Sequence, residues 1–358
     1  MSDVTTPVPP TWPAWTWRGS PDALGLALGS VPREALAPGD VLVRNAVIGL
    51  NPVDWKVLGG DLVNWQRGKV PGVDGAGTVV ALGEGVAPEW LGRRVAYHQS
   101  LHKPGSFAHY TPLAARALLR VPDALDFATA ASFPCPALTA WLAIEKLPLR
   151  AGARVLISGA GGAVGQYLVQ LAAQRGFEVT AMCHPRHAER LAGLGAHACV
   201  PGPLADGNTW ADDNAGRFYA AIDSVDAPHA ARISPVLEAN GHLVCIQGRL
   251  DTAPCPPFGR TLSVHEVALG ALHVYGDDAA WQRLTQAGES MLAAIATGAL
   301  QAEAQHIVRR ARGASRRPAS SRVLGQGARR GGVSRCARPC SDSRGAAQSP
   351  QSRACGSG

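Results

Sequence analysis

The chain has 358 residues, a length typical of two domains, of which 46% are apolar and 17% charged. This composition excludes a coiled coil, a disulfide-dense mini-protein and a charge-dominated disordered chain. The formal net charge of +7 is uneven, because residues 309–358 contain twelve arginines, no lysine and one acidic residue. The first 308 residues hold 22 basic and 26 acidic residues, a net charge of −4. A mildly acidic body therefore precedes a basic tail.

The cysteines and the N-terminus bear on the cellular compartment. Eight cysteines are scattered along the chain without a CxxC pair, and the first residues lack the basic and apolar stretches of a secretory signal. No run of 18 apolar residues is present to cross a membrane. We therefore expect reduced thiols, a cytoplasmic location and no membrane span.

Residues 1–126 consist of β-branched runs separated by glycine and proline turns. This pattern predicts strands at 41–48, 75–82, 93–97 and 106–111. Many short strands with such punctuation are typical of a β-barrel-like domain.

From Asp126 onward, helices and strands are predicted to alternate. Asp126 is expected to cap the first helix, and residues 279–300 form a long helical stretch at the end. The alternation favours an α/β domain with a doubly wound parallel sheet. The remaining predicted helices are 127–132, 137–147, 163–175 and 187–194, and the predicted strands are 154–158, 177–182, 219–223 and 241–246.

A glycine cluster between a predicted strand and a predicted helix is the most informative motif. Gly159 and Gly161 permit a tight turn, Gly162 allows the backbone to approach a pyrophosphate, and Gly165 allows the helix to pack against the strand. The helix dipole and free N–H groups then face the phosphates. A glycine-rich turn of some other doubly wound protein is the alternative. The candidate phosphate-binding residues are Gly159, Gly162, Ala163, Val164 and Gly165.

The end of the following strand indicates which dinucleotide binds. An NAD-selective site carries an acidic residue there for the ribose 2′-hydroxyl, whereas this strand ends in Met182-Cys-His-Pro-Arg-His187. Arg186, with His184 beside it, is suited to a 2′-phosphate, which favours NADP(H). The alternative is that Arg186 is only a solvated charge at a helix start.

Four motifs together resemble the medium-chain dehydrogenase/reductase superfamily, and within it the zinc-independent NADPH:quinone and enone oxidoreductase branch. They are residues 49–56, 71–80, 92–97 and the glycine turn. The resemblance implies a GroES-like catalytic domain at 1–126, a Rossmann NADP-binding domain at 127–275, a return to the catalytic domain at 276–308, an active site between the domains, and a homodimer.

Zinc is not expected. The zinc-dependent branch has an early Cys ligand and a His-Glu pair after Pro-Gly, whereas this chain has Asn51 at the first place and Val73-Asp74 at the second. No four closely spaced cysteines suit a structural zinc. A metal held by Asp54, Asp74 and His98 is the alternative.

Without zinc, hydrogen-bond donors must stabilise the charge that hydride transfer creates on a carbonyl oxygen. A quinone or α,β-unsaturated carbonyl delocalises that charge, which favours such a substrate. The resemblance places Asn51 near the nicotinamide with Lys56 on the same loop, although an Asp54–Lys56 ion pair that holds the loop is an alternative. Tyr97 and His98 are candidate donors, and solvent is another source of the proton.

Further candidate cofactor contacts lie in the second domain. Thr139 resembles the family's cofactor-contacting threonine. Ser224 and Gln247-Gly248 follow predicted strands, and ligands bind beyond the carboxyl ends of parallel strands. Trp55 and Trp65 are candidates for the substrate mouth, with packing as the alternative.

The tail after residue 308 departs from the family, because the expected closing strand is not evident. Residues 309–358 are predicted to be disordered, either as a native appendage or as the product of a reading-frame shift. The rival function is a nucleotide-binding protein without turnover, whose Arg-rich tail contacts nucleic acid or acidic surfaces. Arginines without interleaved aromatic residues make a generic patch, so a nucleic-acid partner is not favoured.

Overall fold

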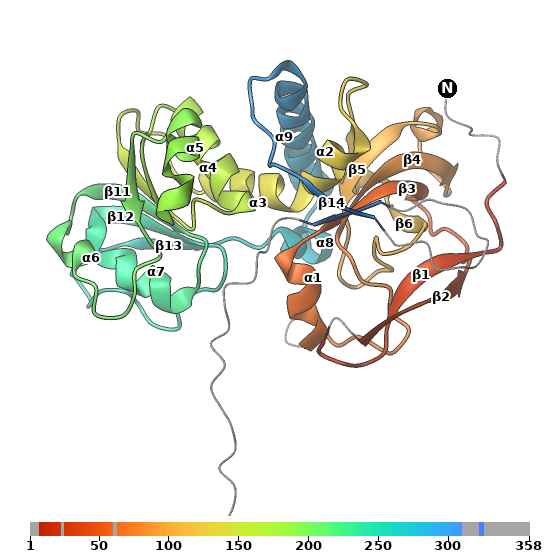
Figure 1. Ribbon diagram of the computed structural model, residues 1–358, viewed down its shortest axis with the longest axis horizontal. Helices are drawn as coiled ribbons and strands as arrows, with labels where there is room; N and C mark the ends of the chain where they lie inside the picture. The colour runs from red at the N-terminus through yellow and green to blue at the C-terminus, as the bar shows by residue number, and fades with distance from the viewer. Residues whose placement is uncertain (1–6, 23–24, 60–62, 310–321, 326–358) are drawn as a thin grey trace, which may run out of the picture. The chain divides into compact units, whose positions relative to one another are not determined.

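The computed structural model describes residues 7–22, 25–59, 63–309 and 322–325. It has the predicted mixed α/β fold, with a GroES-like domain followed by a Rossmann-type parallel sheet (Figure 1). No helix within these ranges has the length and apolar character needed to cross a membrane.

The first domain is built on a long strand, β3 (Asp40–Leu50), which pairs antiparallel with both β4 and β6. Eight of its eleven residues, among them Val41, Val43 and Val47, are buried, as expected for its β-branched sequence. The other strands of this sheet are β4 (Asp74–Leu82), β5 (Arg94–His98), β6 (Tyr110–Ala114), β7 (Leu118–Arg120), β14 (His306–Arg309) and β15 (Arg322–Gly325). A separate hairpin comprises β1 (Thr11–Trp17) and β2 (Leu26–Pro32).

The second domain contains six parallel strands in the order β10-β9-β8-β11-β12-β13. The strand order reverses between β8 and β11, which is where ligands bind in doubly wound sheets. In Figure 1, α4 and α5 lie on one side of this sheet, and α6 and α7 lie on the other. The strands are β8 (Arg154–Ser158), β9 (Glu178–Cys183), β10 (Ala198–Pro201), β11 (Phe218–Asp223), β12 (Leu237–Cys245) and β13 (Ser263–Glu266).

The five predicted helices lie close to their predicted ranges, whereas the short helices at 52–56, 210–213, 227–233 and 272–275 were not predicted. Asp126 caps α2 as predicted, because its carboxylate accepts the backbone N–H of Thr129 at 2.7 Å. The second helix begins at Pro134, three residues before the predicted start, since proline is favoured in a first turn. The helices are α1 (Pro52–Lys56), α2 (Phe127–Ser132), α3 (Pro134–Ile144), α4 (Ala163–Gln174), α5 (Ala188–Gly193), α6 (Trp210–Asp213), α7 (Ala227–Ile233), α8 (Leu272–Tyr275) and α9 (Asp278–Thr297). Single 3₁₀ turns are η2 (Val57–Gly59), η3 (Pro88–Trp90), η4 (Ala115–Ala117), η5 (Pro185–His187), η6 (Ser234–Val236) and η7 (Leu269–Ala271).

The C-terminal segment differs from the prediction at two places. Arg309, expected to begin the disordered tail, is the last residue of β14. Residues 322–325 were also expected to be disordered, but they form β15, which pairs parallel with β3 and antiparallel with β14. A strand thus lies beside β3 where none was evident, because only Val323 and Leu324 supply an apolar signal among arginines. The rest of the predicted tail, residues 310–321 and 326–358, lies outside the described residues.

Candidate functional site

The glycine turn joins β8 to α4 with the geometry that a phosphate site requires. Gly159 has a positive φ of 65°, and Gly162 occupies the N-cap position of α4. A Cβ at Gly165 would lie 2.5 Å from Ala160 Cα, so only glycine allows the helix to approach its own turn this closely. The first N–H groups of α4, at Ala163 and Val164, have no partner within the helix and carry the positive end of its dipole.

Beneath this turn, a buried network joins the carboxyl ends of two central strands. Asp223, at the end of β11, accepts hydrogen bonds from Ser158 of β8 and from His229 of α7, both at 2.5 Å. The backbone N–H of Leu204 donates to the other ring nitrogen of His229 at 3.0 Å. This arrangement is not a hydrolytic triad, because neither nitrogen of the ring is free to take a proton from a nucleophile.

The same network shapes the loop that carries Ser224. The other carboxylate oxygen of Asp223 accepts the backbone N–H groups of Val225 and Asp226 at 2.9 and 3.1 Å. Ser224 lies against the glycine turn, where its Oγ is buried without a hydrogen-bond partner among the described residues. An orphaned hydroxyl at this edge fits a bound dinucleotide, which would supply the missing partner.

A basic cluster borders the turn on the β9 side. His184 and Arg186, both predicted, are joined by His187 and Arg190. Arg186 Nε donates to His187 Nε2 at 3.0 Å, and Arg190 donates to the carbonyl oxygen of Gly161 at 3.0 Å. Desolvation, followed by the nearby Arg190 and Arg186 cations, lowers the pKa of His187. Arg190 was missed in the sequence, although it follows Arg186 by four residues and so comes one helical turn later.

The end of β12 meets the loop that follows β3. Lys56 Nζ lies 2.5 Å from Oε1 of Gln247, which joins a predicted catalytic residue to a predicted cofactor residue. Gly248 comes next, with a φ of 143°. The alternative pairing of Lys56 with Asp54 is wrong, because Asp54 is buried and its oxygens accept backbone N–H groups instead.

Two buried carboxyl groups and the Asn51 amide meet where α1 begins. Asp54 accepts the backbone N–H groups of Asn51 and Val73, at 2.7 and 3.1 Å. Asp74 Oδ2 accepts Asn51 Nδ2 at 2.9 Å and the backbone N–H of Cys135 at 2.8 Å. Burial raises the pKa of Asp54 to about 7 and that of Asp74 well above its usual value. The Oδ1 atoms of Asn51 and Asp74 are buried without a partner in the described chain.

This cluster is linked to Thr139 through α3. Thr139 lies one turn after Cys135, and its hydroxyl opposes part of the rise in the pKa of the Cys135 thiol. Burial raises the pKa of that thiol, so it stays protonated. The structure therefore brings together Asn51 and Thr139, which are predicted residues, and adds Asp74 and Cys135.

Tyr97 is not part of this site, and its prediction as a catalytic donor is wrong. Its side chain is fully buried, and its hydroxyl donates to Asn45 Oδ1 at 2.7 Å and lies 3.0 Å from Thr111 Oγ1. Burial raises the pKa of Tyr97. A hydroxyl held inside the sheet domain by two partners has no path to a substrate.

His98, the neighbouring candidate, forms a pair with His273 of α8. The two rings stack with centroids 5.3 Å apart, and Nδ1 of His98 lies 3.0 Å from Nε2 of His273. Burial holds the pKa of His98 well below its usual value and, together with nearby cations such as Arg116, lowers that of His273 to about 4. The pair is neutral at pH 7, with one ring donating to the other.

The described residues contain no group of three metal-ligating side chains placed to hold an ion, the Asp54, Asp74 and His98 alternative included. Trp55 is 58% exposed beside Lys56, whereas Trp65 donates its indole N–H to the Leu101 carbonyl oxygen at 2.8 Å. Trp55 thus remains available to a substrate, and Trp65 is held by the loop after β5.

Comparison with known proteins gives a consistent result. Residues 37–123 match the alcohol dehydrogenase GroES-like domain. A chloroplast envelope quinone oxidoreductase homolog of Arabidopsis thaliana is 27% identical over 259 residues, covering 69% of this chain and 76% of that protein. A trans-enoyl reductase of Penicillium oxalicum is 29% identical over 278 residues, covering 70% and 73% of the two chains. The Escherichia coli quinone oxidoreductase, solved in complex with NADPH, superposes with a TM-score of 0.67 at 20% identity, covering 82% of this chain and 90% of that one.

Proposed function

We propose that the protein is a member of the medium-chain dehydrogenase/reductase superfamily, and within it an NADPH-dependent oxidoreductase that reduces a quinone or an α,β-unsaturated carbonyl compound without zinc. The relatives named above are quinone and enoyl reductases, which supports both an oxidoreductase and this class of substrate.

The observation that carries the choice of NADPH is the basic cluster beside the glycine turn. Arg186 and Arg190 are two permanent cations, and the strand end before them has no acidic residue to hold a ribose 2′-hydroxyl. Charge-assisted hydrogen bonds from guanidinium groups to a 2′-phosphate are among the stronger interactions available at a protein surface.

Other residues of this chain would bind the remaining parts of the cofactor. The N–H groups at the start of α4 would bind the pyrophosphate, and Ser224 Oγ would gain the partner that it lacks. When bound, the nicotinamide supplies the hydride. Gln247, held by Lys56 after the end of β12, and Thr139, on α3, would contact the cofactor.

The role that we propose for Asn51 is to bind the substrate oxygen. One N–H bond of its amide is engaged by Asp74, which fixes the orientation of the second. A fixed donor stabilises the negative charge that develops on the substrate oxygen without having to reorient. A conjugated substrate delocalises that charge and so requires less stabilisation from the donor. With Tyr97 withdrawn into the core, solvent is the proposed source of the proton.

Zinc independence is proposed from the residues at the positions where the zinc-dependent branch has its ligands. Asn51 and Val73 replace a thiolate and an imidazole, and the carboxylate oxygens of Asp54 already accept backbone N–H groups. The five described cysteines are unpaired, which supports a reducing, cytoplasmic location. A homodimer is proposed on the family resemblance alone.

The decisive test is NADPH oxidation by the purified full-length chain, followed by absorbance, with a panel of quinones, enones and saturated ketones. We expect turnover of the conjugated substrates only, a preference for NADPH over NADH, and no loss of rate after dialysis against a zinc chelator. NADPH binding without turnover on any member of the panel would contradict the proposal and favour the nucleotide-binding rival.

The rival has its own discriminating variant. Truncation after Gly325 removes six of the twelve arginines of the tail but keeps β15 beside β3. Under the proposed function, NADPH oxidation survives this truncation. Salt-sensitive binding of a DNA duplex that weakens strongly on truncation, in a protein without turnover, would support the rival instead.

A further inference from the structure

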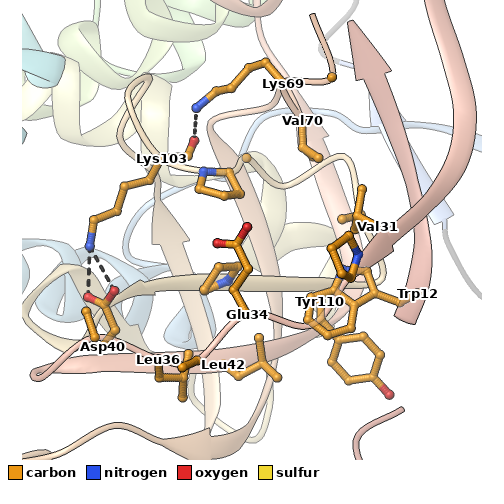
Figure 2. A pocket seen from close by; sticks show the side chains of 18 of the residues that line it. Trp12, Val31, Glu34, Leu36, Asp40, Leu42, Lys69, Val70, Lys103 and Tyr110 are labelled. Carbon is orange, nitrogen blue, oxygen red and sulfur yellow. Dashed lines mark hydrogen bonds and ion pairs between the residues drawn. The ribbon is translucent and has the colours of Figure 1, made fainter. Parts of the chain in front are cut away.

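A cavity lies in the first domain, away from the cofactor residues. It has a volume of about 500 Å³ and opens between the β1–β2 hairpin and the start of β3 (Figure 2). Asp40 and Leu42 line it from the first residues of β3, whereas Asn51 follows the last residue of that strand. Leu42 and Asn51 are separated by roughly 30 Å along an extended strand. The cavity is therefore not the site described above.

The walls of this cavity are largely apolar and include an aromatic pair. The rings of Trp12 and Tyr110 meet with centroids 5.1 Å apart and planes tilted by 49°. Val31, Leu36 and Leu42 add aliphatic surface, and in Figure 2 Val31 lies beside the aromatic pair whereas Leu36 lies beside Asp40. A volume of this size with aromatic and aliphatic lining is typical of a small-molecule site.

The polar side of the cavity carries Lys69, whose ammonium lies 5.7 Å from the centroid of the Trp65 ring but has no carboxylate partner among the described residues. Lys103 is neutralised by Asp40, with Nζ 2.9 and 3.0 Å from the two carboxylate oxygens. Lys69 donates to the carbonyl oxygen of Lys103, and none of the described carboxylates forms an ion pair with it. Burial lowers the pKa of Lys69 to about 8, so it is mostly charged at neutral pH while partly removed from water. A bound anion would offset the free-energy cost of partly removing this cation from water.

The other charge at the cavity is more easily displaced. Glu34 lies on the exposed linker between β2 and β3, and in Figure 2 it lies between the lysines and the aromatic pair. It forms no ion pair with another described residue. An exposed carboxylate on a linker can turn to solvent when a ligand enters, whereas Lys69 is half-buried and anchored.

We propose that this cavity binds a small aromatic carboxylate, with its ring against Trp12 and Tyr110 and its carboxylate paired with Lys69. Apolar walls alone would accept any aromatic molecule of suitable size. The partly desolvated cation without an acidic partner adds the preference for an anion. The inference does not depend on the proposed function, because no residue of the cofactor site takes part.

The test is calorimetric titration of the full-length protein with two probes of the same ring system, 1-naphthoate and 1-naphthalenemethanol. We expect naphthoate to bind about tenfold more tightly than the neutral alcohol, as one charge-assisted contact allows. This comparison uses the unaltered protein, so it stands even if a variant fails to fold. Equal affinities, or no binding of naphthoate at millimolar concentration, would overturn the proposal.

Three variants refine the assignment. Lys69→Met should remove the preference for naphthoate, while Lys146→Met, the same change at an exposed lysine of the second domain, should keep it. Glu34→Gln should strengthen naphthoate binding by about twofold, because a like charge is removed. A preference that survives Lys69→Met would overturn the role of that lysine. NADPH affinity, measured in parallel, should be the same in all three.

Discussion

Lys56 Nζ donates to Oε1 of Gln247 at 2.5 Å, and this contact joins the end of α1 to the loop after β12. The two side chains are 191 positions apart in the chain; Lys56 is the last residue of α1, and Gln247 follows the end of β12 by two residues. The contact orients Gln247 at the edge where the cofactor is proposed to bind. Lys56 thus acts on the cofactor through Gln247, as a positioning residue.

A double-mutant cycle tests this relationship. Lys56→Met and Gln247→Met should each weaken NADPH binding by about three- to tenfold. The loss of NADPH affinity in the double variant should be smaller than the product of the two single-variant losses. The coupling free energy should be about 0.5–1 kcal/mol, because both groups are exposed to solvent. NADPH binding is measured by fluorescence titration. Strictly multiplicative effects would show that the contact plays no part in binding.

The basic cluster makes a prediction about cofactor selectivity. Arg186→Ala and Arg190→Ala should each reduce NADPH affinity by about ten- to a hundredfold while leaving NADH affinity within a factor of three, since only NADPH carries the 2′-phosphate. Arg190→Ala should have a further, smaller effect on both cofactors, because Arg190 also binds the Gly161 carbonyl oxygen. Arg217→Ala, at an exposed arginine of the same domain, is the control. Equal losses of NADPH and NADH affinity would contradict this prediction and indicate that the basic cluster maintains the folded structure instead of binding the 2′-phosphate.

Substitution of Ser224 is expected to weaken cofactor binding without lowering stability. Its Oγ is buried and has no partner, so Ser224→Ala removes an unsatisfied group and should leave the free energy of unfolding unchanged within about 0.5 kcal/mol or raise it. NADPH binding should weaken by about fivefold if the hydroxyl contacts the cofactor. Urea unfolding and fluorescence titration measure the two effects. A variant that is less stable but binds NADPH normally would contradict this interpretation.

The sequence predicted the features that depend on near neighbours in the chain. The glycine turn, the Asp126 cap and the long strands each need only adjacent residues, and each lies where it was expected. The direction of Tyr97 was not predictable, because Val95, Ala96 and Tyr97 of β5 are all buried and no alternation marks the two faces. Without a polar face, the period of two gives no information about which side meets the substrate.

Other features depend on tertiary contacts between distant residues. Asp223 and His229 bond to Ser158 and Leu204, which no local pattern brings together. The cavity at Lys69 is likewise assembled from loops and from the edges of several strands. Such networks become visible only when the strand ends have been placed side by side, whereas a cap or a turn can be recognised within four residues.

Gly165 and Gly193 form a matched pair for testing the glycine turn. A Cβ at Gly165 would lie 2.5 Å from Ala160 Cα and 2.6 Å from the Gly159 carbonyl oxygen, whereas one at Gly193 of α5 meets nothing within 4 Å. Gly165→Ala should lower the free energy of unfolding by about 1–3 kcal/mol and weaken NADPH binding. Gly193→Ala should raise stability by about 0.5–1 kcal/mol through higher helix propensity. Similar losses in the free energy of unfolding of the two variants would show that the close contact with Ala160 and Gly159 is not the reason why position 165 requires glycine.

The His98–His273 pair predicts how stability depends on pH. Burial keeps both rings neutral in the folded protein, with the pKa of His273 lowered to about 4 and that of His98 lowered well below its usual value. In the unfolded chain each ring binds a proton near pH 6.5. The unfolded state therefore binds more protons, so the stability present above pH 6.5 is lost as the pH falls through the range from about 6.5 to about 4.

His273→Gln tests this dependence, because glutamine keeps a hydrogen-bonding side chain but does not titrate. The free energy of unfolding, measured with urea at pH 7.5, 6, 5 and 4.5, should fall less steeply with acid in the variant than in the wild type. The two proteins should differ most in stability at pH 7.5, where the wild type keeps its ring contact, and should converge toward pH 4.5. His197→Gln, at an exposed histidine, should keep the wild-type slope. An unchanged slope in His273→Gln would show that other groups dominate the dependence of stability on pH. Asp54 acts in the opposite direction, because its raised pKa means that the folded state binds a proton before the unfolded state does. Its contribution to stability therefore increases as the pH falls.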